Sequence, residues 1–372
     1  MAKKSGNNIL KTLLWFPSVL YGIIVGTRNK LFDLNLLHSK EFDIPIISVG
    51  NISVGGTGKT PFVEFLVSIL VDHSKLAILS RGYKRKSKGF VLSDKKSTVE
   101  EIGDEPLQMK RKFPGITVAV DNERVHGIQK LLDDDKDLDV ILLDDAYQHR
   151  YVKPGISILL VDYNQPLYSD HYLPLGRLRE HPSEKSRANI VIVTKCPENI
   201  KPMEQRIIKK DLNLFPYQYL FFTRVMYGDI QPVFPGKFKV LSSEICKENK
   251  YNILLVTGIA NSRPLRKQTR GISPKISEVK FPDHHAYSVK DIKKINRNFK
   301  RISSTNKIIL TTEKDAIRLK SLQHIIQQGA KNWYYIPIEV DFHDGKKESF
   351  QSLIIDYVTK NKRNSNLSSV KN

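Results

Sequence analysis

The chain has 372 residues, of which 40% are hydrophobic and 27% charged, and it carries 60 basic against 39 acidic residues for a net charge of +21. This composition excludes a disordered chain, and its basic excess indicates an anionic partner such as nucleic acid, an acidic membrane face or a phosphorylated substrate. The two cysteines, Cys196 and Cys246, lie far apart and outside any C-x-x-C pair, which excludes a disulfide framework and a zinc site and fits a reducing compartment.

The first predicted element is an apolar segment at residues 8–32, NILKTLLWFPSVLYGIIVGTRNKLF. It has no convincing small-residue cleavage site, so a signal peptide is not expected. A spanning helix needs about 20 apolar residues, and Lys11 and Pro17 interrupt this stretch. We predict a helix that lies in the membrane interface, with Trp15, Phe16 and Tyr21 near the headgroups. A spanning helix and a helix buried in the protein's own core are the alternatives.

Residues 51–66 read NISVGGTGKTPFVEFL and suggest a phosphate-binding loop that runs into a helix. The usual pattern G-x-x-x-x-G-K-[ST] fails at its first position, where Ser53 stands in place of Gly. A small residue can begin the turn, and an amphipathic helix is expected from about Gly58 with Pro61 in its first turn. Lys59 would reach the β- and γ-phosphates and Thr60 would bind Mg²⁺. The alternative is a glycine-rich turn with a chance lysine. The predicted nucleotide site comprises Ser53, Val54, Gly55, Gly56, Thr57, Gly58, Lys59 and Thr60.

Further apolar runs alternate with helical segments. The expected strands are FDIPIISVG, KLAILSRG, ITVAV, DVILLDD, GISILLVD and NIVIVTK. Such runs predict an α/β fold of the P-loop NTPase type, a mostly parallel sheet with helices on both faces. The composition shifts near residue 220, and the alternation of strands and helices restarts at YNILLVTGIA. We predict a membrane-associated helix at 1–35, a P-loop domain at 36–220, a strand linker at 221–240, a smaller α/β domain at 241–360 and a disordered tail at 361–372.

The segment DVILLDDAYQHR, residues 139–150, places two carboxylates after an apolar run. A carboxylate at the carboxyl end of a parallel strand lies beside the phosphate loop in this class of sheet, so we predict Asp144 as a metal ligand with Asp145 next to it. An aspartate that caps the next element is the alternative. Gln148 and His149 are expected to line the same cleft, although His149 alone would more often be structural.

Several segments occur in a fixed order between residues 13 and 341 and together resemble one family. They are VGNISVGGTGKTP, LSRGYKRKSKG, GDEP, LLDDAYQHR, LPLGRLRE, VTGIANSRP, FPDHHAY and TTEKDA. This ordered set resembles the tetraacyldisaccharide 4'-kinases, the lipid A 4'-kinases of Gram-negative envelope biosynthesis. In that family a small residue commonly opens the phosphate loop, as Ser53 does here. Departures at Ala146, Tyr147, Ser262 and Leu265 affect only local geometry.

The resemblance implies an ATP- and Mg²⁺-dependent kinase that phosphorylates the 4'-hydroxyl of a tetraacylated glucosamine disaccharide 1-phosphate. It implies residence at the cytoplasmic face of the bacterial inner membrane, where the enzyme would meet its lipid A precursor. The basic excess and the apolar N-terminus agree with an anionic membrane substrate. We expect a monomer that binds no nucleic acid.

The resemblance also implies roles for single residues, with Lys59 among the catalytic ones. Spacing alone would make Asp104 a helix cap, because Pro106 follows it closely. The family's GDEP motif instead suggests Asp104 as the base that accepts the hydroxyl proton, paired with His284 from FPDHHAY; His285 is the fallback. The two residues come from different predicted domains, so they are expected to meet only when the domains close over substrate.

The motif PLGRLRE suggests Glu180 near Mg²⁺ and Arg179 on phosphate, and the alternative is a surface ion pair. Arg81 belongs to a basic run, SRGYKRKSKG, that follows a strand of the predicted nucleotide domain and is expected to contact the substrate headgroup; a solvated loop is the alternative. Residues expected to contact the substrate or to support the site are therefore Arg81, Asp145, Gln148, His149 and Arg179.

Two other function classes compete with a kinase. A P-loop regulatory GTPase or ATPase switch would need an N-K-x-D base-reading motif if it used GTP, and VTKCPEN is only half of one. A nucleic-acid-binding protein would fit the charge, but the chain has no helix-turn-helix, RNP or zinc-finger pattern.

Overall fold

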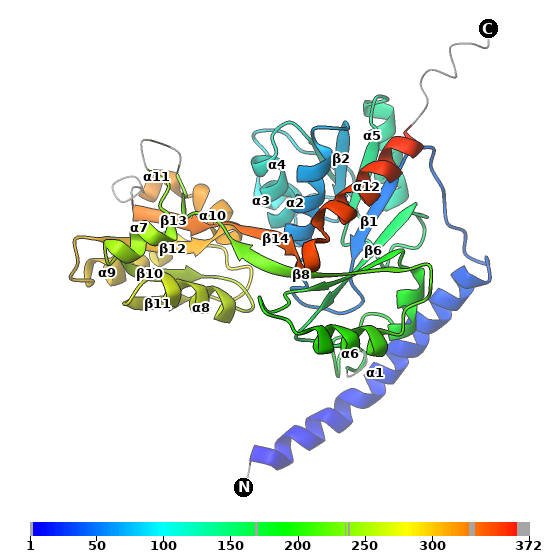
Figure 1. Cartoon of the computed structure of the whole chain (residues 1–372), viewed down its shortest axis with the longest axis horizontal. Helices are drawn as coiled ribbons and strands as arrows, with labels where there is room; N and C mark the ends of the chain where they lie inside the picture. Colours follow the sequence, from blue (N-terminus) through cyan, green and yellow to red (C-terminus); the bar gives the residue numbers. More distant parts are fainter. Residues whose placement is uncertain (1–2, 168–169, 235, 237–238, 327–331, 363–372) are drawn as a thin grey trace.

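The computed structural model describes residues 3–167, 170–234, 236, 239–326 and 332–362, and side chains from residue 12 onward. Residues 363–372 of the predicted tail lie outside this part of the chain. The described residues form a nine-stranded sheet of order β14-β8-β7-β6-β1-β5-β2-β4-β3 and a five-stranded sheet of order β11-β10-β12-β13-β9, side by side in Figure 1.

The large sheet is mostly parallel, as predicted. Only its edge pairs, β3 with β4 and β14 with β8, are antiparallel. Its strands are β1 (Ile46–Gly50), β2 (Leu76–Ser80), β3 (Val91–Leu92), β4 (Thr117–Val120), β5 (Val140–Asp144), β6 (Ile156–Asp162), β7 (Ile190–Thr194), β8 (Tyr219–Tyr227) and β14 (Ile338–Phe342).

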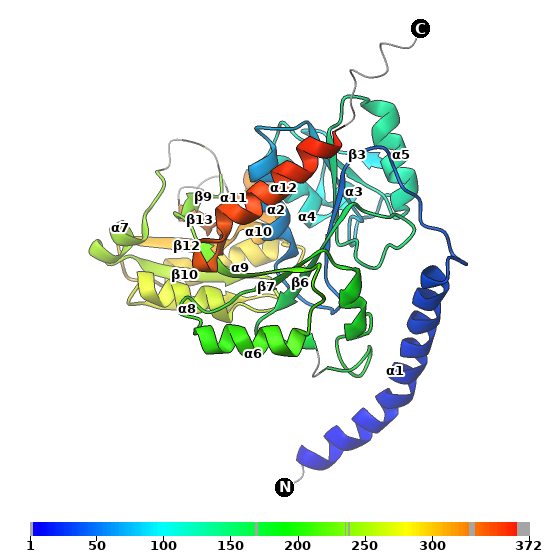
Figure 2. The ribbon, with the colours of Figure 1, turned by 45° about the vertical axis from the view of Figure 1, so that its right-hand side comes forward.

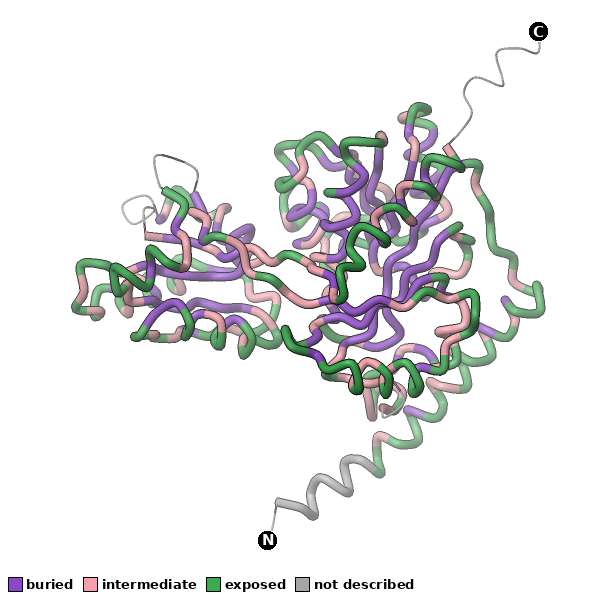
Figure 3. Tube along the Cα trace, in the orientation of Figure 1, coloured by how far each residue is buried: buried purple, intermediate pink, exposed green. Residues whose placement is uncertain are grey.

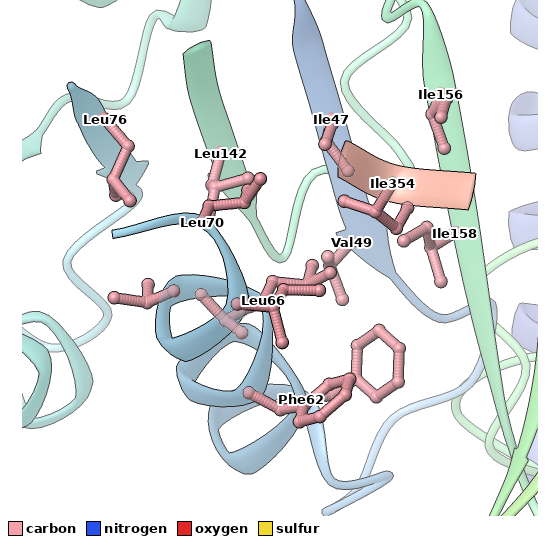
Figure 4. Close-up of a cluster of buried hydrophobic side chains, with 14 of the residues drawn as sticks. Ile47, Val49, Phe62, Leu66, Leu70, Leu76, Leu142, Ile156, Ile158 and Ile354 are labelled. Carbon is pink, nitrogen blue, oxygen red and sulfur yellow. The ribbon is translucent and has the colours of Figure 1, made fainter. Parts of the chain in front are cut away.

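Helices cover both faces of the large sheet, because successive strand residues point to opposite sides. In β1, Ile47 and Val49 pack with α2 (Lys59–Leu70) and α12 (Lys347–Asn361), whereas Ile46 packs with α5 (Arg124–Asp134) on the other face. Figure 4 shows the first of these cores, in which Phe62, Leu66 and Leu70 line one side of α2. α6 (Pro202–Leu212) shares the face of α5, and the short α3 (Val99–Ile102) leads into α4 (Asp104–Lys112).

The small sheet repeats this plan with four parallel strands and an antiparallel edge. Figure 3 shows the central strands of both sheets as buried. The strands are β9 (Gln231–Pro232), β10 (Asn252–Thr257), β11 (Ile276–Lys280), β12 (Lys307–Thr312) and β13 (Trp333–Ile336). The helices are α7 (Ser243–Glu248), α8 (Arg263–Ile272), α9 (Val289–Lys300), α10 (Glu313–Lys320) and α11 (Gln323–Ile326).

Two antiparallel strands connect the sheets. β8 leaves the large sheet, and β14 returns beside it from the small one (Figure 1). After β14, α12 packs Phe350 and Ile354 into the large core. The range 241–360 predicted for the smaller domain therefore includes elements that pair with the large sheet, and the domain limits themselves stay a prediction.

Helix α1 (Lys3–Asp33) lies at the edge of the large-sheet part and projects beyond it at its N-terminal end (Figures 1 and 2). Its apolar side chains are largely exposed: Leu13, Trp15, Phe16, Leu20, Ile23 and Ile24. Polar bonds hold it to the body, such as Ser18 Oγ donating to the Tyr172 carbonyl at 2.7 Å. Among the described residues, no helix has the length and hydrophobicity that crossing a membrane requires.

Candidate functional site

The predicted phosphate loop lies between β1 and α2. Gly55 and Gly58 have φ values of 119° and 87°, a left-handed region that strongly favours glycine. A Cβ added at Gly56 would meet no atom within 4 Å, so the loop is open on that side. α2 begins at Lys59 without a side-chain cap. Its first N–H groups can therefore bind an anion, as the loop pattern predicts.

Neighbouring segments hold the loop in shape. The Val54 N–H donates to the Arg177 carbonyl at 2.7 Å, and Thr194 Oγ1 donates to the Thr57 carbonyl at 2.8 Å. Lys195 donates to the Gly56 carbonyl and to Asp162. Ser53 is buried, and its carbonyl accepts from the Asn51 amide. A serine at the first position is thus accommodated by backbone contacts.

Lys59 projects from the first turn of α2 toward the carboxyl end of β5. Its ammonium donates to Asn51 Oδ1 at 3.0 Å and lies 3.5 Å from Asp145 Oδ1. Asp145 also accepts from Arg179 Nη1 at 3.1 Å. Burial would raise the pKa of Asp145, but Lys59 and Arg179 outweigh burial and hold that pKa below its ordinary value. The structure therefore brings Lys59, Asp145 and Arg179 together in one charged group.

Asp144 ends β5 and is the residue best suited to a cation. Its Oδ2 accepts from Ser80 Oγ at 3.1 Å, whereas its Oδ1 is buried without a hydrogen-bond partner. Burial and the neighbouring Asp145 raise the pKa of Asp144 to about 6. A Mg²⁺ ion would neutralise this carboxylate and satisfy its free oxygen, and oxygen is the ligand that Mg²⁺ prefers. Asp144, with the half-buried Thr60 of the loop, thus fits the predicted metal position.

Glu180 has a different environment from the one predicted. It is fully buried, and its carboxylate accepts from Asn29 at 3.1 Å, Gln148 at 3.2 Å and Arg187 at 2.7 Å. Protein donors thus occupy both oxygens, so its geometry favours a structural link between α1 and the site. Across the described residues, no three His, Cys, Asp or Glu side chains are grouped to hold a metal ion. The metal role of Glu180 stays a prediction.

The remaining predicted residues surround the same edge of the sheet. Gln148 donates to the Asn51 carbonyl at 2.8 Å, and Arg81 is exposed. Burial together with Arg124 and Arg81 lowers the pKa of His149 to about 4, so the ring is neutral near pH 7. These residues line the site without a contact that identifies their ligand.

Arg124 was missed by the sequence reasoning. It is 2% exposed, and two of its guanidinium nitrogens, Nε and Nη2, are buried without a hydrogen-bond partner. Burial lowers the pKa of Arg124 to about 10, although the negative charges of Asp144 and Asp145 act to raise it. The segment NERVHG gives no motif signal for this position, since only the fold places the residue near the two aspartates.

Asp104 and His284 meet in this structure, although 180 residues separate them. His284 Nδ1 lies 3.0 Å from Asp104 Oδ2. We expected the two residues to meet only when the domains close over substrate. They are already in contact in the described structure. Asp104 is also not a helix cap: Gly103 occupies the N-cap of α4, and Asp104 is its first helical residue. The fallback His285 donates from Nε2 to Asp291 Oδ2 at 3.0 Å and stacks on Phe281 with ring centroids 4.6 Å apart. Both contacts give this ring a structural environment.

An ionic group around the buried Glu64 links the two sheets beside this pair. Lys112 on α4 lies 2.7 Å from Glu64 on α2 and 3.3 Å from Glu313 on α10. Glu64 also accepts from Gln108 at 2.7 Å. Burial and the Glu64 charge raise the pKa of Glu313 to about 7, against the opposing effect of Lys112. One lysine thus balances the buried Glu64 and the half-buried Glu313, which come from different parts of the fold.

We expect Lys112→Met to lower the free energy of unfolding by about 2 kcal/mol at pH 8, because it leaves the buried Glu64 and the half-buried Glu313 without this cation, whose own exposure to water weakens both pairs. The pKa of Glu313 is raised in the folded state, so the folded protein binds more protons than the unfolded chain between pH 4.5 and 7. The loss should therefore shrink as the pH falls through that window. Urea unfolding at pH 8 and pH 6 measures both effects.

The matched control is Lys75→Met, which removes a lysine from an exposed pair with Asp135 and should change stability little. Equal losses for the two variants would show that Lys112 acts as an ordinary surface residue. A larger loss at Lys112 that does not depend on pH would show that Glu64, and not Glu313, is its effective partner.

Comparison with known proteins gives consistent results. The family model described as tetraacyldisaccharide-1-P 4'-kinase matches residues 10–359. The tetraacyldisaccharide 4'-kinase of Bacteroides thetaiotaomicron is 47% identical over 367 residues, which cover 96% of each chain. The tetraacyldisaccharide 4'-kinase of Flavobacterium johnsoniae is 43% identical over 354 residues, which cover 95% of this chain and 99% of the relative. The crystal structure of LpxK from Aquifex aeolicus in complex with ATP matches with a TM-score of 0.72 and 31% identity, covering 94% of this chain and 99% of that one.

Proposed function

The chain belongs to the tetraacyldisaccharide-1-P 4'-kinase family, and we infer that it is an ATP-dependent kinase of lipid A biosynthesis. It transfers the γ-phosphate of ATP to the 4'-hydroxyl of a tetraacylated glucosamine disaccharide 1-phosphate. The phosphate loop supplies the nucleotide site. The acceptor hydroxyl is placed at the Asp104–His284 pair, where the two parts of the fold meet.

One observation carries this proposal: the carboxylate–imidazole pair includes Asp104 of α4, and α4 is bonded through Gln108 to Glu64 of α2, the helix that follows the phosphate loop. Glu105, next to Asp104, is close enough to Asp144 for its charge to contribute to the raised pKa of that carboxyl, after burial and Asp145. A hydrolase or a switch needs a water near the γ-phosphate, whereas a kinase needs a proton acceptor for a hydroxyl. The Asp104–His284 pair supports the second arrangement.

Within this site, Lys59 and the first N–H groups of α2 neutralise the transferring phosphoryl group. Asp144 and Thr60 would hold Mg²⁺, which adds positive charge at the phosphates. Asp104 accepts the proton of the 4'-hydroxyl while the new bond from oxygen to phosphorus forms and the bond to the leaving ADP breaks. Because phosphoryl transfer proceeds with little early bond formation, a weakly basic carboxylate suffices.

The acyl chains of the substrate and the membrane are proposed to meet the protein at α1. The exposed apolar side chains of its described part support a helix in the interface, with Trp15 and Phe16 58% and 69% exposed. A groove of about 290 Å³ lies between this helix and the loop after β6, lined by residues that include Trp15, Tyr172 and Leu175. Its position supports acyl-chain binding, and the lipid A precursor as substrate is the reason we propose action at the cytoplasmic face of the inner membrane.

We expect Trp15→Glu with Phe16→Glu to lower partition onto anionic phospholipid vesicles about tenfold or more, because two exposed aromatic side chains that would enter the membrane interface are lost. Lipid phosphorylation should fall with it, whereas ATP binding should not. Vesicle co-sedimentation and nucleotide titration measure the two effects. The control places the same charges at Met203 and Ile207, which are equally exposed on α6. If that control releases the protein from vesicles as strongly, α1 is not the membrane contact.

The remaining alternative is a P-loop regulatory GTPase or ATPase switch. Lys195, which belongs to the partial base-reading motif, bonds instead to the Gly56 carbonyl and Asp162. Incubation with ATP or GTP, Mg²⁺ and the disaccharide 1-phosphate lipid tests the proposal, with the phosphorylated lipid detected by mass spectrometry. Product from ATP supports the kinase, whereas nucleotide hydrolysis without product would favour the switch.

A further inference from the structure

Helix α10 contributes two cations to the Asp104–His284 pair. Arg318 donates from Nε to Asp104 Oδ1 at 3.1 Å and from Nη2 to Oδ2. Lys314, one turn earlier, lies 3.3 Å from His284 Nε2 and 2.6 Å from Glu105. The pair therefore meets an arginine fork on its carboxylate and an ammonium at the far side of its imidazole. None of these contacts lies in the phosphate loop.

The arginine fork is fixed before it reaches Asp104. Arg318 is 6% exposed, and its Nη1 donates to Asp315 at 3.1 Å and to the Gly258 carbonyl at 3.2 Å. Asp315 is fully buried and accepts from the Gly258 N–H at 2.9 Å and from Thr312 Oγ1 at 2.8 Å. A planar guanidinium held at one end by these bonds presents the other end in a fixed direction. The small sheet thus sets the orientation of a carboxylate that belongs to the large one.

These contacts decide which nitrogen of His284 carries the proton. Burial alone would raise the pKa of Asp104. The hydrogen bonds from His284 and Arg318, with the Arg318 charge, outweigh burial and hold that pKa well below its usual range, so the carboxylate is ionised. An ionised Oδ2 at 3.0 Å from Nδ1 accepts a hydrogen bond and would repel a lone pair. Arg318 Nη2 also lies 3.3 Å from Nδ1, but it already donates to Oδ2, and the shorter contact of Nδ1 is the one with the ionised oxygen. The hydrogen is therefore assigned to Nδ1. Nε2 is left to accept from Lys314, and a ring with both nitrogens protonated would direct an N–H at that ammonium.

The same contacts distinguish the two oxygens of Asp104. Oδ2 accepts from both Arg318 and His284, whereas Oδ1 accepts only the Arg318 Nε–H among the contacts of the described residues. A carboxylate oxygen has two lone pairs. Oδ1 thus keeps one lone pair for a further donor, and Oδ2 keeps none.

We propose that Arg318 is a positioning residue of the kinase: it clamps Asp104 so that Oδ1 receives the substrate hydroxyl and so that the ring proton of His284 stays on Nδ1. The proposal rests on the proposed function for its kinetic consequences, but the His284 tautomer is a property of the protein alone. Lysine cannot replace the arginine here, because its single ammonium cannot bond Asp104 through two parallel donors and hold Asp315 at once.

The first test is the ¹⁵N NMR spectrum of histidine-labelled full-length protein, with His284 assigned by comparison with His284→Gln. We expect shifts typical of a neutral ring protonated at Nδ1 in the wild type, and a mixture of tautomers in Arg318→Met. A wild-type ring protonated at Nε2, or an unchanged spectrum in the variant, would overturn the proposal. This result does not depend on turnover, so it stands apart from the lipid-kinase assay of the proposed function.

The second test is kinetic. Arg318→Met should lower kcat for the lipid about 100-fold, a loss typical of a misplaced catalytic group, and should leave the KM for ATP within about twofold. The acid limb of its pH profile should move to higher pH, because the pKa of Asp104 rises when the fork is lost. Arg318→Lys should restore the acid limb more than kcat, since charge returns without the fork.

The matched control is Arg111→Met. Arg111 also joins α4 to α10, through the Ile317 carbonyl at 3.2 Å, but has no contact with Asp104 in the described structure. It should leave the tautomer and the pH profile unchanged. If Arg111→Met reproduces the loss and the shifted acid limb, Arg318 only joins the two parts of the fold and the proposal fails. Thermal unfolding of each variant confirms that folded protein is compared.

Discussion

Lys59→Ala is expected to lower kcat about 1000-fold, because a cation aimed at the transferring phosphoryl group is worth several kcal/mol in the transition state. Lys59 is the first residue of α2, where its ammonium bonds Asn51 and lies 3.5 Å from Asp145. ATP would draw this ammonium toward its phosphates and away from Asp145. The quantity to measure is the steady-state rate of lipid phosphorylation at saturating ATP.

Two further measurements separate this role from a structural one. The melting temperature of Lys59→Ala should fall by only a few degrees, because Arg179 still bonds Asp145 and neutralises it when the ammonium is lost. Lys153→Ala, which removes a lysine from an exposed pair with Glu41, should keep full activity. A Lys59→Ala enzyme with nearly wild-type kcat would remove the basis for the nucleotide site.

Much of the fold was predictable because its signals are local. Short apolar runs such as those of β1, β5 and β7 are buried on both faces, and a parallel sheet covered by helices is the arrangement that requires this. The phosphate loop was predictable for a similar reason, since glycines at left-handed positions, a lysine and a following helix are adjacent in the chain. Ser53 did not obscure it, because the first loop position is held by backbone contacts.

The return of the chain to the large sheet was not predictable from local signals. β14 and α12 read like the last strand and helix of the second unit, and only pairing with β8 and burial of Phe350 among Phe62 and Phe221 place them elsewhere. Such choices depend on contacts more than 100 residues apart in the chain, which hydrophobic periodicity does not encode.

The site residues also divide into those with a local sequence signal and those set only by distant contacts. Asp104 and His284 were found through family motifs, whereas Arg318, Lys112 and Arg124 were missed because their partners are distant in sequence. One signal for Arg318 was available: in EKDAIRLK, Asp315 and Arg318 stand at i and i+3 in α10, within a stretch from Asp315 to Leu319 that is buried throughout. Charged residues on the buried part of a helix need partners, and so mark a polar contact inside the protein.

The second large loss of activity is expected for variants of the Asp104–His284 pair. We expect Asp104→Asn and His284→Gln each to lower kcat between about 100-fold and 10,000-fold, the range for loss of a general base or its partner. The KM for ATP should change little, because neither residue contacts the phosphate loop in the described structure. The double variant should lose much less than the product of the two single losses, since residues that act as one unit are not additive.

Asparagine is the informative replacement for Asp104. Alanine would leave the Arg318 guanidinium buried without its carboxylate, at a cost in stability of about 3 kcal/mol. An activity loss could then reflect unfolding. Asn keeps the shape and one acceptor oxygen for Arg318 but cannot take up a proton, so it removes basicity while retaining most of the contact.

If the two losses of kcat multiply fully in a double-mutant cycle at saturating lipid, the imidazole and the carboxylate act separately. Asp104 would then be a lone base, and the 3.0 Å contact with His284 would have only a structural role.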